Sequence, residues 1–257
     1  MRLVARKVKS LSRKIFKRKS LHIQPDDIFL VSYPRSGNTW MRYLLANLLE
    51  PTEIWHIGNI NRVLPDTHEP WPSDWIPRTP RLLKSHSSYR YEFRRVIYLY
   101  RDGRDVAISY HHFLQKLHQE QRTFDEFFDD FIRGQVPYGS WQAHLDGWMF
   151  TEHSGQEIIT LSYEKLYQTP VPEISRLAAF LGCAWSETEI LTAVEKSTYR
   201  NFQVDYKTRL YDSHWNKGFR GGVKGGPGQW KETLTPQQNA LFWRITEQVS
   251  SRLELEQ

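Results

Sequence analysis

The sequence has little cysteine, and this scarcity of thiols excludes several classes of protein. Cys183 is the single cysteine among 257 residues, so the chain can form neither an internal disulfide framework nor a cysteine-based zinc site. Long apolar runs are also missing, since no stretch approaches the roughly 20 apolar residues that span a bilayer. These absences predict a soluble, cytoplasmic protein from a reducing compartment.

Acidic residues are missing from positions 1–25, which carry nine lysines and arginines. The net charge of +6 therefore belongs to this tail, and we expect no nucleic-acid partner for the slightly acidic remainder. Val4, Val8, Leu11 and Ile15 recur at helical spacing, so the tail could contact a membrane surface, act as a targeting leader or remain a solvated extension. We favour the last interpretation and divide the chain into a basic extension, 1–25, and one domain, 26–257.

Strand-like and helix-like segments alternate along the domain, and this order predicts a single α/β domain with a central parallel sheet flanked by helices. The expected strands are residues 28–33, 81–84, 95–100 and 157–161. The expected helices are residues 38–49, 105–117, 124–132, 141–150 and 186–194, with a last helix beginning at 235. A Ser or Thr followed three residues later by Glu or Gln predicts capping boxes at Thr123, Ser186 and Thr235.

Two regions lack the periodicity of either element. Residues 51–80 hold six prolines and three tryptophans, which indicates a long irregular excursion over the surface. Its Trp55, Trp71 and Trp75 suggest either an apolar or sugar-stacking lid, or ordinary packing away from solvent. Residues 218–228 contain six glycines and are expected to form a flexible loop.

The first candidate site is the segment YPRSGNTW, residues 33–40, between an expected strand and an expected helix. The free amides and the positive dipole end of a helix N-terminus bind anions. Arg35 adds a forked cation, Ser36 and Thr39 add hydroxyls, and Gly37 permits close approach of the backbone. An ordinary N-cap turn uses the same residue types, so this segment alone predicts only an anion at a helix N-terminus.

Two further segments follow expected strands. Arg101 follows the strand 95–100, and Ser109 lies about two turns into the next helix, so both could contact one phosphate. The alternative is that Arg101 or Arg104 only pairs with a neighbouring aspartate on the surface. His86 follows the strand that carries Lys84, at the edge where open α/β sheets bind ligands, and histidine is the natural general base at neutral pH.

These three segments, in this order, resemble the family of sulfotransferases that use 3′-phosphoadenosine 5′-phosphosulfate (PAPS). The resemblance covers residues 26–245 and implies the family's P-loop-kinase-like fold. YPRSGNTW is similar to the family's 5′-phosphosulfate loop, YPKSGTTW, with Arg35 in place of the lysine and Asn38 in place of the first threonine. RDGRDVAISYHHF is similar to the 3′-phosphate segment, and KSH is similar to the catalytic lysine and histidine. The resemblance therefore implies that Arg101 and Ser109 bind the 3′-phosphate.

The glycine-rich loop departs from the family pattern RKGxxGDWK. Counting back from Trp230 places Lys224 and Gly225 on the lysine and glycine, whereas the arginine position holds Val223 and Arg220 is its candidate replacement. The dimer motif of the family is not retained, so the oligomeric state stays open. The resemblance implies that the donor is bound by Arg35, Ser36, Gly37, Asn38, Thr39, Trp40, Arg101, Ser109, Tyr163, Ser197, Tyr199, Arg220, Lys224 and Gly225, with Trp40, Tyr163, Ser197 and Tyr199 at the adenine.

The implied reaction is in-line transfer of a sulfuryl group from PAPS to the hydroxyl of a small molecule, which could be a phenol, alcohol, sugar or lipid. His86 would remove the hydroxyl proton, while Arg35 and Lys84 would stabilise the charge on the sulfuryl oxygens and the leaving phosphate. We expect no metal, because the donor is already activated and no cluster of metal ligands is visible. The alternatives are a P-loop-type small-molecule kinase and a non-catalytic module that binds anions or membranes.

Overall fold

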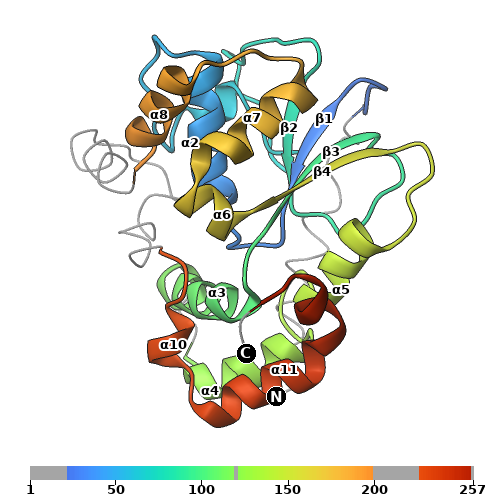
Figure 1. Cartoon of the computed structure of the whole chain (residues 1–257), viewed down its shortest axis with the longest axis vertical. Helices are drawn as coiled ribbons and strands as arrows, with labels where there is room; N and C mark the ends of the chain where they lie inside the picture. The colour runs from blue at the N-terminus through green and yellow to red at the C-terminus, as the bar shows by residue number, and fades with distance from the viewer. Residues whose placement is uncertain (1–21, 119–120, 199–225, 256–257) are drawn as a thin grey trace.

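A four-stranded sheet forms the centre of the computed structural model, which describes residues 22–118, 121–198 and 226–255. The strands are β1 (Ile28–Val31), β2 (Leu82–Ser85), β3 (Arg95–Tyr100) and β4 (Glu157–Ser162). The pairings are parallel, and the strand order is β2-β1-β3-β4 (Figure 1). The parallel sheet predicted from the sequence is therefore confirmed.

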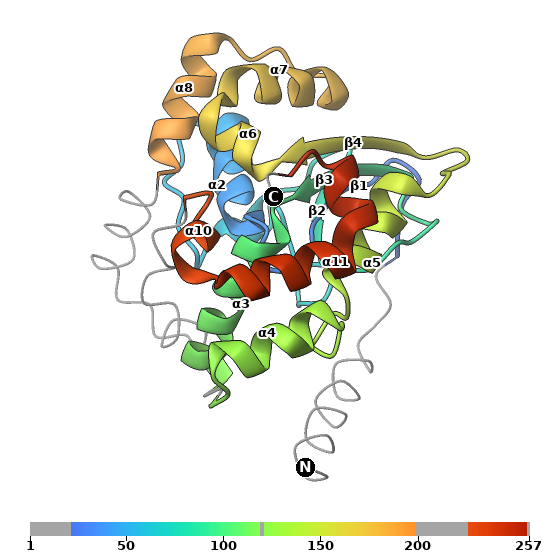
Figure 2. The same cartoon turned by 60° about the horizontal axis from the view of Figure 1, so that its bottom comes forward.

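Helices pack against both faces of this sheet (Figures 1 and 2). One layer contains α2 (Asn38–Leu49), α6 (Tyr163–Gln168), α7 (Pro170–Leu181) and α8 (Glu187–Lys196). The other layer contains α3 (Gly103–His118), α4 (Phe124–Ile132), α5 (Trp141–Leu145), α10 (Trp230–Thr233) and α11 (Pro236–Arg252).

Alternate residues of the strands divide the core into two clusters. In β1, Ile28 and Leu30 belong to the cluster beneath α2, α7 and α8, whereas Phe29 and Val31 belong to the cluster beneath α3, α4 and α11. This division follows from the two-residue period of a strand, and it explains why β1 is apolar throughout. Because both faces are covered, polar chemistry is confined to the ends of the strands.

The starts of three helices were predicted correctly from their capping boxes. The capping boxes at Thr123, Ser186 and Thr235 are all formed, and the bounds of α4 and β3 are the predicted ones. The predicted helix 141–150 is helical throughout, but it is α-helical only over Trp141–Leu145, because the backbone changes at Asp146 into a π-helical turn, Asp146–Phe150. In this turn the indole of Trp148 donates a hydrogen bond to the Ser87 carbonyl at 3.0 Å.

Helices α6 and α7 were not predicted, and neither was the short helix α10. The Ser162 side chain caps α6 by accepting a hydrogen bond from the amide of Lys165. Helix α7 has Pro170 in its first turn and ends at Gly182, whose φ of 71° is left-handed. Proline in the first turn and glycine just after the last residue are typical of helix ends, so the sequence does contain signals for both ends of α7.

The excursion 51–80 is irregular, as predicted, apart from a short 3₁₀ turn, Ile60–Arg62. Trp55 is 3% exposed and lies in the core beneath α2, which favours ordinary packing over a lid for this residue. The rings of Trp71 and Trp75 lie 4.8 Å apart, and the guanidinium of Arg81 lies 5.3 Å from the Trp71 ring.

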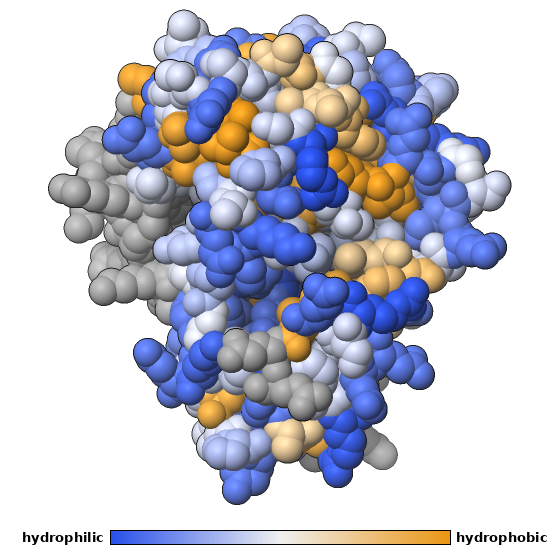
Figure 3. Space-filling view, in the orientation of Figure 1, coloured by the Kyte–Doolittle hydropathy of each residue, from blue (hydrophilic) through white to orange (hydrophobic). Residues whose placement is uncertain are grey.

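The face drawn in Figure 3 is mostly hydrophilic, and the apolar residues on it form separate patches. Within the described ranges, no helix combines the length and apolar character needed to cross a membrane. The basic extension lies outside the described residues as far as position 21.

Candidate active site

The carboxyl ends of the four strands bring the predicted site residues to one edge of the sheet. Strand β1 leads into residues 33–37, β2 into His86, β3 into Arg101 and β4 into Tyr163. The chain continues from β1 to β2 on one side and then to β3 on the other. The strand order therefore reverses beside β1, which is where open α/β folds bind their ligands.

The turn between β1 and α2 has the geometry of an anion-binding loop. Arg35 and Gly37 both have left-handed φ angles, 71° and 98°, and α2 begins immediately afterwards at Asn38. The hydroxyl of Ser36 and the side-chain carbonyl oxygen of Asn38 are buried and have no hydrogen-bond partner among the described residues. Buried polar atoms normally have a partner, so the Ser36 hydroxyl, which can donate, suits a loop that binds an anion, whereas the Asn38 oxygen can only accept a hydrogen bond.

Gly37 has no room for a side chain. A Cβ atom at this position would lie 2.5 Å from a ring carbon of Tyr163. The ring of Tyr163 in turn packs edge-to-face against that of Trp40, with 5.4 Å between the ring centroids. The two aromatic residues expected at the adenine therefore lie side by side, next to the anion-binding turn.

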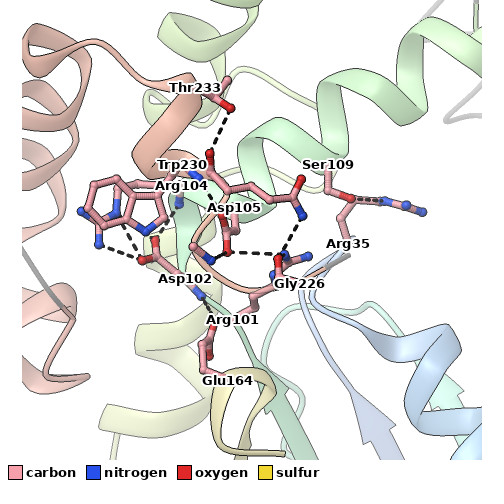
Figure 4. A network of polar contacts seen from close by, with 12 residues as sticks. Arg35, Arg101, Asp102, Arg104, Asp105, Ser109, Glu164, Gly226, Trp230 and Thr233 are labelled. Atoms are coloured by element: carbon pink, nitrogen blue, oxygen red, sulfur yellow. Dashed lines mark hydrogen bonds and ion pairs between the residues drawn. The ribbon is translucent and has the colours of Figure 1, made fainter. Parts of the chain in front are cut away.

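Arg35 and Arg101 come from different strands and approach one another at this edge (Figure 4). The Nε of Arg35 donates to Ser109 Oγ at 3.2 Å, and its guanidinium lies 4.7 Å from the centroid of the Phe113 ring. Burial, with repulsion from Arg101, lowers the pKa of Arg35 to about 10, so this guanidinium stays charged at neutral pH. Two neighbouring cations, one half-buried and one buried, favour the binding of an anion between them.

Arg101 is connected to the end of the glycine-rich loop. Its Nη2 donates to the Gly226 carbonyl at 3.1 Å and lies 3.4 Å from Asp105 Oδ2. Asp105 also accepts hydrogen bonds from the backbone amides of Gly228 and Trp230, at 2.7 and 3.0 Å. Asp105 therefore joins the start of α3, the arginine and the residues at the start of α10 (Figure 4).

Arg101 and Arg104 do pair with neighbouring aspartates, but the alternative that places these pairs on the surface is wrong. Arg101 is 4% exposed, and Arg104 is fully buried. The Arg104 guanidinium contacts Asp102 Oδ2 at 2.7 Å and donates to Asn239 Oδ1 at 2.8 Å, with the Trp230 ring centroid 3.5 Å away. Arg104 thus holds α3 against α10 and α11, and Arg101 is the arginine that lies at the carboxyl end of β3.

His86 is held in one orientation by the backbone of β1. Its Nδ1 lies 2.8 Å from the carbonyl oxygen of Ser32. A carbonyl oxygen only accepts, so Nδ1 carries the proton, and Nε2 keeps its lone pair. Burial, followed by the charge of Lys84, lowers the pKa of His86 well below 6.5. The imidazole is therefore neutral at pH 7 and can accept a proton at Nε2.

Sequence reasoning missed Asp66, which is the partner of Lys84. The Lys84 ammonium lies 2.5 Å from Asp66 Oδ2, and both side chains are mostly buried. Asp66 belongs to the irregular excursion, and no local pattern in the sequence links it to a residue 18 positions later. The same segment carries three other acids, Glu53, Glu69 and Asp74, so its composition did not single out Asp66 either.

Some of the remaining residues predicted to bind the donor lie in the described part of the chain, and others lie outside it. The Ser197 hydroxyl donates to the Ala193 carbonyl at 2.7 Å and lies 3.4 Å from Asn47 Nδ2, so its described bonds hold α8 and α2 together. Thr39 lies in the first turn of α2. Four of the predicted donor-binding residues lie outside the described residues: Tyr199, Arg220, Lys224 and Gly225.

Within the described ranges there is no group of three or more metal-ligating side chains.

Comparison with known proteins places this site in a family. The model of the sulfotransferase domain matches residues 25–254. Sulfotransferase 1A1 of Rattus norvegicus is 30% identical over 243 residues, which cover 85% of this chain and 82% of that protein. Sulfotransferase 4A1 of Homo sapiens is 30% identical over 251 residues, covering 91% and 83%. The chain therefore belongs to the sulfotransferase family, and the enzyme class predicted from its motifs is confirmed.

Solved structures share the fold. Mouse sulfotransferase SULT7A1, determined with PAP, aligns with a TM-score of 0.68 at 24% identity and covers 88% of this chain and 84% of its own. Retinol dehydratase, determined with androsterone and the inactive cofactor PAP, aligns with a TM-score of 0.71 at 20% identity and covers 97% and 88%. These likenesses confirm the single α/β domain of the family.

Proposed function

We propose that this sulfotransferase moves the sulfuryl group of PAPS to the hydroxyl of a small molecule, with His86 as the general base. The observation that carries the proposal is the meeting of two guanidinium groups, the half-buried Arg35 and the buried Arg101, at the same sheet edge as a neutral histidine whose Nε2 can accept a proton. PAP in the structures of two fold neighbours supports PAPS as the donor.

The donor would be held at three points along the sheet edge. Arg35, Ser36 and the amides at the start of α2 would bind the 5′-phosphosulfate. Arg101 and Ser109 would bind the 3′-phosphate, and the adjoining rings of Trp40 and Tyr163 would contact the adenine. Hydroxyls and guanidinium groups that now bond one another, such as Ser109 and Arg35, would then turn their donors toward the nucleotide.

The transfer step needs positioning and charge stabilisation rather than a covalent enzyme intermediate. The acceptor oxygen attacks sulfur while its proton passes to His86 Nε2, and the bond between sulfur and the bridging phosphate oxygen breaks. Arg35 and Lys84 would stabilise the negative charge that develops on the sulfuryl oxygens and on the departing phosphate. The hydrogen bond from Nδ1 to Ser32 keeps the imidazole aligned and stabilises it when it is protonated.

The acceptor is proposed to carry an apolar ring beside its hydroxyl. Tyr138 is 55% exposed, and its ring centroid lies 5.8 Å from that of His86. The backbone of Tyr138 has a φ of 74°, which a non-glycine residue adopts only when its surroundings hold it there. An aromatic surface held next to the base suits phenols and alicyclic alcohols, and a fold neighbour crystallised with androsterone supports this class.

The proposal is tested by donor binding and by transfer. Adenosine 3′,5′-bisphosphate should raise the melting temperature, whereas ATP with magnesium should not, since mass action stabilises the state that binds. Sulfuryl transfer from labelled PAPS to a mixed library of phenols, alcohols, sugars and lipids should then identify the acceptor. Stabilisation by ATP with magnesium alone would instead indicate a kinase, and stabilisation by neither nucleotide would indicate a non-catalytic module.

A further inference from the structure

The backbone places Asp66 beside the strand that carries Lys84. The amide of Lys84 donates to the Pro65 carbonyl, and the amide of Thr67 donates to the Lys84 carbonyl, both at 2.9 Å. These two bonds form an isolated parallel bridge between Asp66 and Lys84 in a segment that otherwise lacks strands. The relative position of the two residues is therefore fixed by the main chain and does not depend on a flexible surface contact.

Both oxygens of the Asp66 carboxylate are engaged. Oδ2 accepts from the Lys84 ammonium at 2.5 Å, and Oδ1 accepts from the backbone amide of His68 at 2.9 Å. The Asp66 side chain is 11% exposed and that of Lys84 is 13% exposed. A carboxylate bound at both oxygens has one favourable orientation, so it holds the ammonium in one place.

The surroundings of Lys84 oppose its charged form, and Asp66 favours it. Burial lowers the pKa of Lys84, and so does Arg42, which extends from α2 into the same cluster. Asp66 and Glu69 oppose that shift. The other titratable groups that face the cluster are His68, Tyr138 and His86. Since Arg42 is itself buried and donates to the Leu64 carbonyl at 2.7 Å, it stays in place as a repelling cation.

We propose that Asp66 is a positioning residue for sulfuryl transfer, which keeps the Lys84 ammonium charged and fixed two residues from the general base. This inference rests on the proposed function of the site. An ammonium group has three donors, so one can remain on Asp66 while another reaches a sulfuryl oxygen. The long excursion 51–80 then has a role in catalysis, because it supplies the acid that β2 lacks.

Asp66→Asn separates this role from a structural one. Loss of the carboxylate charge should lower the pKa of Lys84, so competitive acylation of its amine, followed by mass spectrometry, should be at least about threefold faster at neutral pH. In the same variant, kcat should fall by about 10- to 100-fold because the cation is lost or misplaced. Affinity for adenosine 3′,5′-bisphosphate should stay near that of the wild type.

Two further variants complete the test. Asp27→Asn is the matched control, since Asp27 pairs with Arg81 at 2.5 Å at the opposite end of β2 and its side chain is fully buried. It should lower stability without changing the acylation of Lys84. Asp66→Glu keeps the charge but moves it by one methylene, so it should restore the acylation profile and only part of kcat.

The labelling experiment needs neither donor nor acceptor, which separates the inference from the proposed function. Unchanged acylation of Lys84 and unchanged kcat in Asp66→Asn would overturn the inference in an enzyme that remains active. An equal change in Asp27→Asn would also overturn it, because the effect would then be a general loss of stability. A wild-type protein that transfers no sulfuryl group would refute the proposed function, whereas faster labelling in Asp66→Asn would still show that Asp66 controls Lys84.

Discussion

At the scale of the residue, the hydrogen bond between His86 Nδ1 and the Ser32 carbonyl leaves Nε2 as the basic nitrogen. We expect His86→Ala to lower kcat by about 10²–10⁴-fold, the usual contribution of a general base, with little effect on nucleotide affinity. Single-turnover kinetics and calorimetry with adenosine 3′,5′-bisphosphate measure the two quantities. His153→Ala is the control, since the His153 ring bonds the Trp148 carbonyl. Near wild-type kcat in His86→Ala, with chemistry limiting, would remove His86 from the mechanism.

The lowered pKa of His86 has a direct consequence for pH dependence. A general base works in its neutral form, and burial together with Lys84 moves protonation of this imidazole to below pH 6.5. The value of kcat/KM, which reports the free enzyme, should therefore stay level as the pH falls through 6.5 and decline only at more acidic values. A decline centred at or above pH 6.5 in the wild type would contradict the burial and charge arguments for this residue.

Arg101 and Ser109 are expected to select PAPS over adenosine 5′-phosphosulfate, which lacks only the 3′-phosphate. A charge-assisted hydrogen bond contributes roughly 1.5–3 kcal/mol, so Arg101→Ala should weaken PAPS binding by about 10- to 100-fold or more. Binding of adenosine 5′-phosphosulfate should hardly change. Calorimetry with both donors measures this selectivity.

The comparison of two donors guards against structural damage in these variants. Arg101 is buried against Asp105, so its removal also leaves a buried acid without its cation. Ser109→Ala is milder, because the described bond of this hydroxyl is the one from Arg35. Equal weakening of both donors in both variants would show that neither side chain reads the 3′-phosphate.

At the scale of the element, the β1–α2 turn depends on Gly37 for two reasons, its left-handed φ and its contact with Tyr163. Gly182 after α7 is also left-handed, but a Cβ there would meet nothing within 4 Å. Gly182→Ala should therefore lose about 1–2 kcal/mol of stability from the backbone alone. Gly37→Ala should lose more and should also weaken nucleotide binding, because Tyr163 must move. Thermal unfolding and calorimetry measure both, and equal losses in the two variants would contradict the steric argument.

The elements that the sequence predicted well have strong local signals. Strand β3 contains the apolar and aromatic run Val96–Tyr100, and α4 opens with a complete capping box at Thr123, so both elements followed from neighbouring residues. The π-helical turn that begins at Asp146 could not be predicted in this way. In this turn the Trp148 indole donates a hydrogen bond to the carbonyl of Ser87, a residue 61 positions away in the sequence. Tertiary contacts of this kind leave no periodic pattern in the sequence.

At the scale of the whole molecule, the basic extension is expected to be dispensable for turnover of a soluble acceptor. The family match begins at residue 25, and the candidate site begins at Ser32. Deletion of residues 1–21 keeps His22, whose carbonyl accepts a hydrogen bond from Arg81. The truncated chain should retain the melting temperature and kcat of the full chain. A folded truncation with no transfer activity would show that the extension takes part in the reaction.

Most of the candidate site could be predicted because it follows the strands. Arg35, His86, Arg101 and Tyr163 each lie just after a strand, and parallel strands place such residues at one edge. Asp66 could not be predicted, because it approaches that edge from an irregular segment through two backbone bonds to Lys84. Residues that follow strands can be located from the local sequence. Their polar partners, such as Asp66 for Lys84, depend on contacts between distant segments.

The bridge between residues 65–67 and Lys84 also bears on self-association. Strand β2 lies at one side of the sheet, and an open edge strand offers free amides and carbonyls to which another chain can add a strand. Here the amide and carbonyl of Lys84 are already bonded to Pro65 and Thr67. The same contact that places an acid beside the lysine therefore occupies this position of the edge, where another chain could otherwise pair with the strand.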